Sequence, residues 1–312
     1  MKQSRFSLAD VITFLVALAF GFVCFLGMNF YTLGDISQSI TLGIIITVLL
    51  GGTAYAAKSL KRVNRNFKTS FVLEIIMLTL FTGFTAFFAY TSFPHYFNVT
   101  ARKTEIQSKI NNSIMQATGM FAQYDQYAED RLTLYERRLE TVAGAQHVNP
   151  STYRDYGFVN NVANSTQIDN KLFSLRAELF PSHYSDSTSG NGIKEIATDW
   201  LVKARSTTNN WRPIGVVSVV NAVEKNSQEW LGELIGFSSV RAQYEEATDF
   251  VHPLLFDDVK ARFTTKGTPK PFSILLAVGA YVLMLLSYLI SKRSSKTSVG
   301  TSKERGKYDI EF

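Results

Sequence analysis

Residues 11–31 read VITFLVALAFGFVCFLGMNFY, an apolar run without a single charged residue. Three further apolar runs occupy residues 40–57, 71–90 and 272–290. A helix needs about 20 apolar residues to cross the roughly 30 Å of hydrocarbon in a bilayer, and each run is close to that length. A helix on the surface of a water-soluble domain would show a polar face instead. The sequence therefore predicts an all-α membrane protein with four transmembrane helices.

Lysine and arginine gather in the three segments that flank these runs on one side of the predicted membrane. If all four runs span, these segments share that side, whereas the turn between the first two runs carries only Asp35. Basic loops remain in the cytoplasm, so both termini are expected there. The basic residues concerned are Lys2, Arg5, Lys58, Lys61, Arg62, Arg65, Lys68, Lys292, Arg293, Lys296, Lys303, Arg305 and Lys307.

The net charge of +6 is therefore a topology signal rather than a sign of nucleic-acid binding. Between Arg102 and Lys270 the charges nearly cancel, with 19 Lys and Arg against 20 Asp and Glu. No basic patch interleaved with aromatic residues appears in this segment. The membrane bilayer is an expected partner of the chain, and nucleic acid is not.

These patterns divide the chain into four parts. Residues 1–92 are expected to form a three-helix membrane region with spans at about 11–31, 40–57 and 71–90. Residues 93–270 form a large helical extracytoplasmic domain between spans three and four, residues 271–291 the fourth span, and residues 292–312 a basic cytoplasmic tail. The tail is expected to act as a stop-transfer anchor, with binding of anionic lipid as the alternative.

A single cysteine, Cys24, lies in the first apolar run, so the chain can form no internal disulfide. Exported eukaryotic domains of this size commonly carry disulfides. Localisation in a bacterial inner membrane is therefore favoured over a eukaryotic plasma membrane. The first run lacks a small-residue cleavage site, so we expect it to remain as a span rather than to be removed as a signal peptide.

The longest helix is predicted over residues 101–143, which contain no proline and carry apolar residues in steps of three and four. A helix of that length must lie against other helices or against a partner chain, because an isolated one is only marginally stable in water. Phe121, Tyr124 and Tyr135 lie on its apolar face and are the candidate partner-binding residues.

Further helices are expected at residues 167–180 and 193–206, from Pro213 onward with Asn226 as a candidate break, and at residues 240–251. The β-branched run at 216–220 could form a strand, but the absence of a hairpin signal favours a helical bundle. Residues 182–192 are predicted to be a mobile loop, and residues 263–271, rich in glycine and proline, a flexible tether to the membrane.

Glu74 is the one ionisable residue well inside a predicted span and is the intramembrane functional candidate. Two interpretations compete. Glu74 lies near the cytoplasmic interface, where a neighbouring lysine or arginine can pair with it, and this reading is favoured; the alternative is a role in moving ions or protons. Asp10, at the start of the first span, is expected to cap that helix.

Small residues at four-residue spacing mark the candidate positions for close packing between membrane helices. The pattern favours a packed bundle and is compatible with a homo-oligomer without requiring one. The candidates are Gly43, Thr47 and Gly51 in the second span, Thr79 and Gly83 in the third, and Ala277 and Ala280 in the fourth.

No catalytic, cofactor-binding or metal-binding residue is predicted. The histidines at 95, 147, 183 and 252 lack the helical spacing of a zinc site and are expected on the solvated surface. The acidic pairs at 129–130 and 245–246 are expected on solvated helix faces.

The sequence thus favours a non-catalytic membrane protein whose extracytoplasmic domain binds another membrane or envelope protein, for assembly of a complex or for sensing. The alternatives are a channel or transporter subunit with Glu74 in its conduction path, and a membrane-bound enzyme with an unmarked active site.

Overall fold

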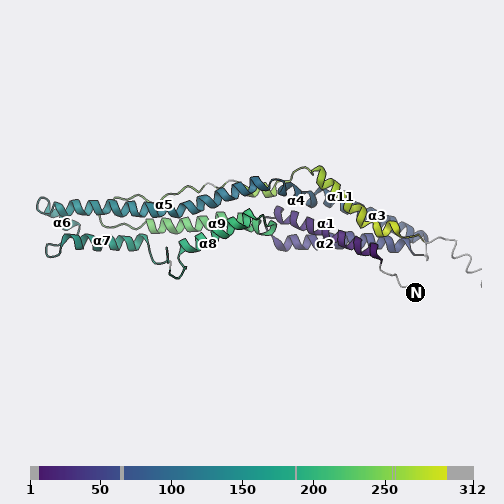
Figure 1. Cartoon of the computed structure of the whole chain (residues 1–312), viewed down its shortest axis with the longest axis horizontal. Coiled ribbons are helices and arrows are strands. Elements are labelled where there is room, and N and C mark those ends of the chain that lie inside the picture. Colours follow the sequence, from purple (N-terminus) through teal and green to yellow (C-terminus); the bar gives the residue numbers. More distant parts are fainter. Residues whose placement is uncertain (1–6, 64–66, 187, 255, 257, 294–312) are drawn as a thin grey trace, which may run out of the picture. The chain divides into compact units, whose positions relative to one another are not determined.

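The computed structural model describes residues 7–63, 67–186, 188–254, 256 and 258–293, and within these residues every regular element is a helix (Figure 1). The all-helical prediction is confirmed for this part of the chain. The helices are α1 (Leu8–Tyr31), α2 (Ile36–Lys61), α3 (Phe67–Tyr90), α4 (Ser92–Thr100), α5 (Lys103–Gly144), α6 (Pro150–Asp155), α7 (Asn164–Leu179), α8 (Ile193–Asn209), α9 (Pro213–Ser238), α10 (Val259–Thr264), α11 (Pro271–Met284) and α12 (Leu286–Ile290).

The chain divides into two compact units, each with its own core. Unit 1 comprises Met1–Thr104 and Lys260–Phe312, and unit 2 comprises Glu105–Val259. The segments 93–104 and 260–270, which we expected in the extracytoplasmic domain, therefore pack with the apolar helices. Of the expected cytoplasmic tail, only Lys292 and Arg293 are among the described residues.

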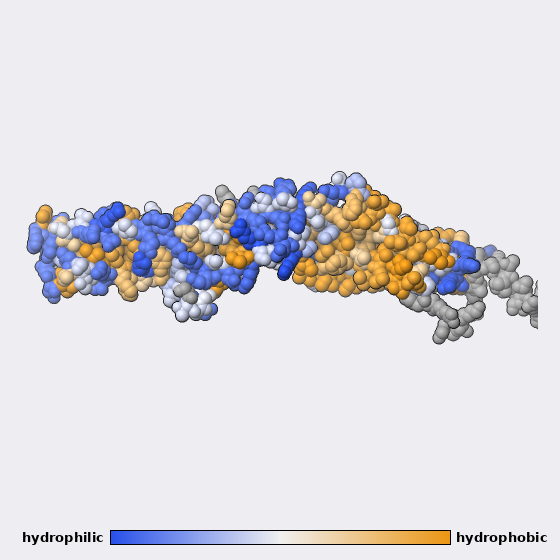
Figure 2. Space-filling view, in the orientation of Figure 1, coloured by the Kyte–Doolittle hydropathy of each residue, from blue (hydrophilic) through white to orange (hydrophobic). Residues whose placement is uncertain are grey.

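Unit 1 contains three helices that are long and apolar enough to cross a membrane: Leu8–Tyr31, Ile36–Lys61 and the stretch Lys68–Thr100, which joins α3 and α4. Figure 2 shows apolar surface over α1, α2, α3 and α11, and mostly polar surface over the helices of unit 2. Membrane association is therefore supported directly by three spans. The segment after Pro271 is interrupted between α11 and α12 at Leu285.

The first two spans form a tight hairpin. Leu33 and Gly34 adopt positive φ angles of 53° and 93°, and the Asp35 side chain accepts the Gln38 amide at 3.0 Å to cap α2. A positive φ costs glycine nothing, so Gly34 suits this turn. The turn brings α2 back antiparallel along α1.

The segment 271–290 runs from one end of unit 1 to the other. At its start, the Phe272 ring lies 5.9 Å from that of Phe97 in α4. At its end, Ser287 and Tyr288 contact the beginnings of α1 and α3 through Asp10 and Glu74. These contacts place the two ends of the segment at opposite ends of the spanning helices.

Unit 2 is organised around α5, whose apolar face is buried against the shorter helices and the segment that follows α9 (Figure 1). At the C-terminal end of α8, the Gln107 amide donates to the carbonyls of Thr208 and Asn209 at 2.7 and 3.0 Å, which the helix itself leaves unpaired. The core includes Tyr124, Leu132 and Leu139 of α5, Leu179 of α7, Ala197 of α8, Leu234 of α9 and Phe250.

Two of the local predictions in unit 2 are wrong. Residues 240–251 form no helix, because their backbone and side chains are held by contacts to α5 and to the end of α9. Helix α9 continues through Asn226 without a break, and the adjacent Ser227 is fully buried. The β-branched run at 216–220 belongs to α9 and not to a strand.

The loop at 182–192 is fixed by specific contacts where it is described. Tyr184 is buried and donates to Asp125 at 2.5 Å, and Glu195 accepts from the Ser185 hydroxyl at 2.6 Å. At Gly192 a Cβ atom would come within 2.5 Å of the Asp186 amide nitrogen. The described residues of this segment are thus held by side-chain contacts, and the close approach at Gly192 requires glycine there.

The expected tether near 263–271 is also held in place. His95 Nε2 lies 2.7 Å from the Phe263 carbonyl, and the Asn98 amide donates to the Gly267 carbonyl at 3.1 Å. The ring of Phe263 is buried 5.6 Å from that of Phe30. The return segment is therefore packed onto α4 and the end of α1.

Candidate functional site

Asp10 lies at the centre of a buried polar cluster in unit 1. It accepts the Ser7 amide at 2.8 Å, which confirms the expected cap at the start of α1. It also forms an ion pair with Lys58 and accepts the Ser287 hydroxyl. Asp10 and Lys58 are only 2 % and 4 % exposed, so the carboxylate links α1, α2 and α12 where little water can replace these bonds.

Glu74 is also buried and has a basic partner. Its Oε1 atom accepts the Tyr288 hydroxyl and the Arg293 guanidinium, both at 2.6 Å. Lys61 donates to the Tyr288 carbonyl at 2.8 Å, which adds α2 to the same contact region. The structure thus supplies the pairing expected of Glu74, whereas a role in ion conduction stays a prediction.

The candidate packing positions divide into two groups. Gly43 and Gly51 face α1: a Cβ atom at Gly43 would lie 2.9 Å from that of Phe25, and one at Gly51 would lie 3.2 Å from the Phe14 ring. Thr47 lies between them and would contact a Cβ atom at Gly21. These small residues permit the close approach of α1 and α2.

In the other apolar helices the pattern is less consistent. Thr79 and Gly83 lie on the exposed face of α3, and a Cβ atom at Gly83 would meet no atom within 4 Å. Ala277 is buried against the core of unit 1, and Ala280 is partly buried beside it. The packing role is therefore visible for α2 and α11, but not for α3 within this chain.

Phe121, Tyr124 and Tyr135, the candidate partner-binding residues, are 4 %, 0 % and 5 % exposed. The Tyr124 hydroxyl donates to the Leu179 carbonyl of α7 at 2.8 Å, and burial raises the pKa of this tyrosine. The apolar face of α5 is thus occupied by other helices of the same chain. These three side chains form no exposed docking surface.

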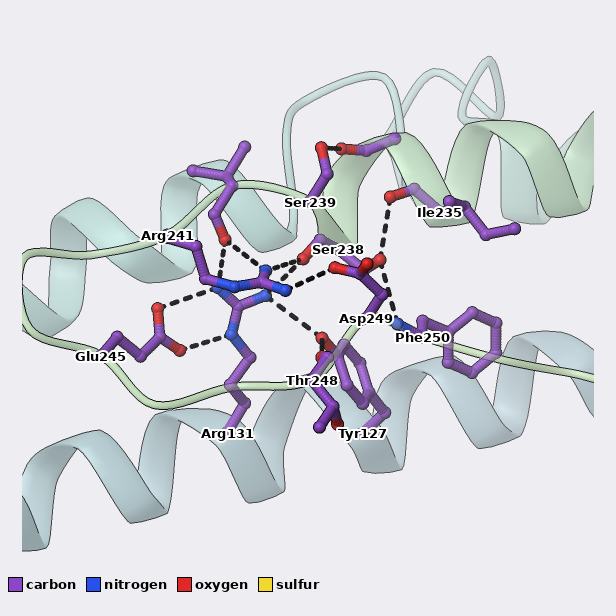
Figure 3. A network of polar contacts seen from close by, with 12 residues as sticks. Tyr127, Arg131, Ile235, Ser238, Ser239, Arg241, Glu245, Thr248, Asp249 and Phe250 are labelled. Atoms are coloured by element: carbon purple, nitrogen blue, oxygen red, sulfur yellow. Dashed lines mark hydrogen bonds and ion pairs between the residues drawn. The ribbon is translucent and has the colours of Figure 1, made fainter.

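A network of polar contacts in unit 2 surrounds Arg131 of α5 (Figure 3). Its Nη2 atom donates to Glu245 Oε2 at 2.8 Å, and its Nε atom donates to Oε1 of the same carboxylate. Nη1 donates to the Ser238 carbonyl at 2.8 Å and to the Tyr127 hydroxyl at 3.3 Å, and Nη2 donates further to the Val240 carbonyl. The guanidinium therefore joins α5, the end of α9 and the segment after α9.

All five N–H donors of Arg131 have acceptors in this arrangement. Burial opposes its charge, but the hydrogen bonds and the negative charge of Glu245 outweigh that effect and raise the pKa of the guanidinium. Because no donor is left for a ligand, Arg131 is a positioning residue. Its hydrogen bonds hold the end of α9 and the segment after α9 against α5.

The segment fixed by Arg131 comprises residues 240–254, which we call the strap. The Tyr127 hydroxyl donates to the Thr248 carbonyl at 2.6 Å, and the Phe250 amide donates to the Ser238 hydroxyl at 3.2 Å. Arg241 pairs with Asp249. In Figure 3 the strap passes between α5 and the end of α9.

A cleft of about 830 Å³ lies along the strap and α5. Apolar side chains at its border are largely exposed: Leu134 is 62 %, Tyr244 50 % and Val251 80 % exposed. Acidic residues also line it, including Asp130 and Glu246. A volume of this size is within the range of ligand-binding clefts, so this cleft is the candidate functional site of unit 2.

Three polar residues that we expected on the surface are buried. His95 and His252 are 5 % and 9 % exposed, and the Glu245 side chain is 4 % exposed. His252 Nδ1 lies 2.6 Å from Gln123 Oε1, and burial lowers the pKa of this histidine. Each is therefore buried with a hydrogen-bonding partner, as buried polar groups require.

Sequence reasoning did not identify Arg131, although a signal was available. Arg131 lies three residues after Ala128 and four before Tyr135, both of which are buried on the apolar face of α5. A charged residue at such a position must find a buried partner. The partner itself, Glu245, is 114 residues away and carries no comparable signal.

No group of three or more His, Cys, Asp or Glu residues suited to holding a metal ion occurs among the described residues. Comparisons of the chain with known protein families, with curated proteins and with solved structures find no match.

Proposed function

We propose that the chain is an integral protein of a bacterial inner membrane with four transmembrane helices, and that α11 and α12 together form the fourth. Their contacts with Phe97 at one end and with Asp10 and Glu74 at the other support this, because the segment extends along the other spans. Its 20 residues, 271–290, would rise about 30 Å as a helix.

The basic residues support an orientation with both chain ends and the α2–α3 connection in the cytoplasm. Lys58, Lys61, Arg62 and Arg293 all belong to the end of unit 1 that contains Asp10 and Glu74. In this orientation unit 2 lies outside the cytoplasm.

Unit 2, in this proposal, is a non-catalytic domain that binds another envelope protein for assembly of a complex or for sensing. The single observation that carries the proposal is the cleft between α5 and the strap, with Leu134, Tyr244 and Val251 exposed along it. Exposed apolar side chains surrounded by polar ones are typical of protein-binding surfaces.

The alternative of an ion-conducting path through Glu74 receives less support. Both hydrogen bonds to its Oε1 atom come from within the chain, and Phe81 and Phe88 are buried about two and four helical turns further along the same face of α3. Thr85 is a buried polar residue on the same face, but its hydroxyl donates to the Phe81 carbonyl of the same helix at 2.7 Å.

The topology is tested by cysteine labelling in a Cys24→Ser background. A cysteine at Val148, which is 88 % exposed, should react with a membrane-impermeant maleimide in intact spheroplasts. A cysteine at Arg62 should react only after the membrane is permeabilised. The opposite pattern would reverse the proposed orientation.

Partner binding is tested with a photocrosslinking amino acid placed at Leu134 in native membranes. We expect one protein to be captured repeatedly and identified by mass spectrometry. A matched control places the same amino acid at Val202, which is 63 % exposed on α8 and does not line the cleft. Capture of lipid alone, or of the same protein mixture from both positions, would contradict the proposal.

A further inference from the structure

Two segments of unit 1 concentrate positive charge where α3 ends and the chain returns to the membrane. Residues 91–104 and 260–271 carry six lysine and arginine residues and no acidic residue. The hydrogen bonds of His95 and Asn98 to carbonyls of the second segment hold the two segments together. One end of unit 1 therefore gathers these cations, which are Arg102, Lys103, Lys260, Arg262, Lys266 and Lys270.

Three of these cations, Arg102, Lys266 and Lys270, form what we call the basic patch. The backbone stays helical through the C-cap residue of α4, so Arg102 follows His95 and Asn98 in steps of three and four. Arg102 therefore lies on the face of the helix that holds the return segment. The charges of Arg102 and Lys266 both act on the His95 ring. Like charges gathered around one residue repel each other, so a bound anion would stabilise them.

No cation of the basic patch has an acidic partner among the described residues. Lys266 and Lys270 are exposed, and Arg102 is partly exposed. The nearest described acids in the sequence, Glu105 and Asp258, belong to unit 2 and make interactions of their own. The described part of the chain thus leaves the patch accessible and without a counter-charge.

The basic patch lies at the border of the apolar surface of unit 1. The Lys266 ammonium is 4.9 Å from the centre of the Tyr31 ring, and Tyr31 is the last residue of α1. Phe272 follows Lys270 by two residues and is 62 % exposed, and its ring lies 5.9 Å from that of Phe97. Aromatic rings at the ends of membrane helices favour the depth at which hydrocarbon meets the headgroups. The patch is therefore at the level of the lipid phosphates.

We propose that the basic patch binds the phosphate headgroup of an anionic phospholipid of the surrounding membrane. A guanidinium donates two parallel N–H groups to one phosphate, and the two ammonium groups add charge-assisted donors. The exposed rings of Tyr31 and Phe272 offer apolar contacts that the chains of a lipid supply and a soluble anion does not. This inference concerns unit 1 alone and is independent of partner binding by unit 2.

The test places a reporter tryptophan beside the patch by Phe272→Trp in the full chain. Nanodiscs of phosphatidylcholine receive increasing amounts of phosphatidylglycerol or phosphatidylcholine with bromine on the upper part of an acyl chain. Bromine quenches tryptophan fluorescence only at short range, so the reporter detects the lipid next to it. The native tryptophans lie in unit 2, and the chain without the reporter gives their background.

We expect the brominated phosphatidylglycerol to associate at least about 5-fold more tightly than the brominated phosphatidylcholine, which corresponds to the contribution of one cation near anionic lipid. Arg102→Gln with Lys266→Gln should reduce this preference to below about 2-fold. Exchanging the two cations, by Arg102→Lys with Lys266→Arg, keeps the charge and should keep most of the preference. A matched control, Arg137→Gln with Arg205→Gln, removes two exposed cations from unit 2 and should leave it unchanged.

Equal association of the two lipids beside the unaltered patch overturns the inference, and this comparison stands even if a variant fails to fold. An undiminished preference in the glutamine pair overturns it as well, because the attraction then comes from other charges. A loss in the exchanged pair as large as in the glutamine pair would contradict a role of charge. Excess glycerol 3-phosphate should not displace the lipid; complete displacement would assign the patch to a soluble phosphate and refute binding of a lipid.

Discussion

Replacing Arg131 by alanine should destabilise unit 2 more than any surface substitution. The change leaves the Glu245 carboxylate, 4 % exposed in its side chain, without its cation. It also removes the donors to the Ser238 and Val240 carbonyls. Removing one partner of a buried ion pair costs about 3–5 kcal/mol, because the remaining charge stays desolvated. We expect a loss in this range for Arg131→Ala.

A double-mutant cycle separates the pair from its surroundings. Glu245→Leu alone should also be destabilising, since it leaves the Arg131 charge buried. The double variant Arg131→Met with Glu245→Leu removes both charges and restores apolar volume, so it should recover at least half of the loss. The interaction energy between the two positions should be about 2–3 kcal/mol.

Tryptophan fluorescence is a suitable assay, because Trp200, Trp211 and Trp230 are the three tryptophans of the chain and all lie in unit 2. Urea titration of the full chain in detergent then reports the free energy of unfolding of that unit. Arg176→Ala is a matched control, since it breaks the exposed ion pair between Arg176 of α7 and Glu129, which lies on α5 like Arg131. This change should cost less than about 1 kcal/mol. A loss below about 1 kcal/mol for Arg131→Ala, or additive effects in the cycle, would refute the reasoning.

Two further predictions test other contacts. Gly21→Ala places a Cβ atom 2.8 Å from the Gly43 carbonyl oxygen and should destabilise the α1–α2 pair by about 1–3 kcal/mol. Gly52→Ala, whose Cβ atom would meet no atom within 4 Å, should be neutral or stabilising. Unfolding in sodium dodecyl sulfate, followed by circular dichroism, measures both stabilities, and equal values for the two variants would contradict the close packing. Burial lowers the pKa of His252, so the unfolded chain, with a pKa of about 6.5, takes up a proton that the folded chain does not. The free energy of unfolding should therefore fall as the pH drops through 6.5 toward the lowered pKa, and His252→Asn, which keeps a donor to Gln123, should remove this dependence; identical pH profiles from 7.5 to 5.5 would show that this histidine does not contribute.

The membrane helices and α5 were predictable because each is encoded by a local pattern. The apolar run at 11–31 falls within α1, and the stripe through Ile106, Tyr124 and Leu139 is the buried face of α5. Such periodicity depends only on residues within a few turns of each other. The sequence did not show what covers that face, because an apolar stripe can pack equally well against another protein or against helices of the same chain.

The strap was wrongly predicted to be a helix because its amino-acid composition resembles that of a helix. Residues 240–251 contain good helix formers, and the irregular spacing of their apolar residues fits a helix as well as an irregular segment. The outcome is decided by Arg131, Tyr127 and Ser238, which bind the strap through its backbone and through Glu245. These interactions join residues that lie more than 100 positions apart in most cases, so tertiary contacts override the local preference.

The return segment, residues 263–271, shows the same limit. Gly267, Pro269 and Pro271 suggested a flexible tether, and flexibility would separate any motion of unit 2 from the spans. Instead, His95 and Asn98 of α4 hold the backbone of this segment at Phe263 and Gly267, and a Cβ atom at Gly267 would lie 3.1 Å from the Asn98 amide nitrogen. Because α4 also leads into α5, both connections to unit 2 leave from one packed group of residues. The prediction of a flexible tether fails for these residues because the groups that hold them lie in α4, 168 and 169 positions away in the sequence, where no local pattern reveals them.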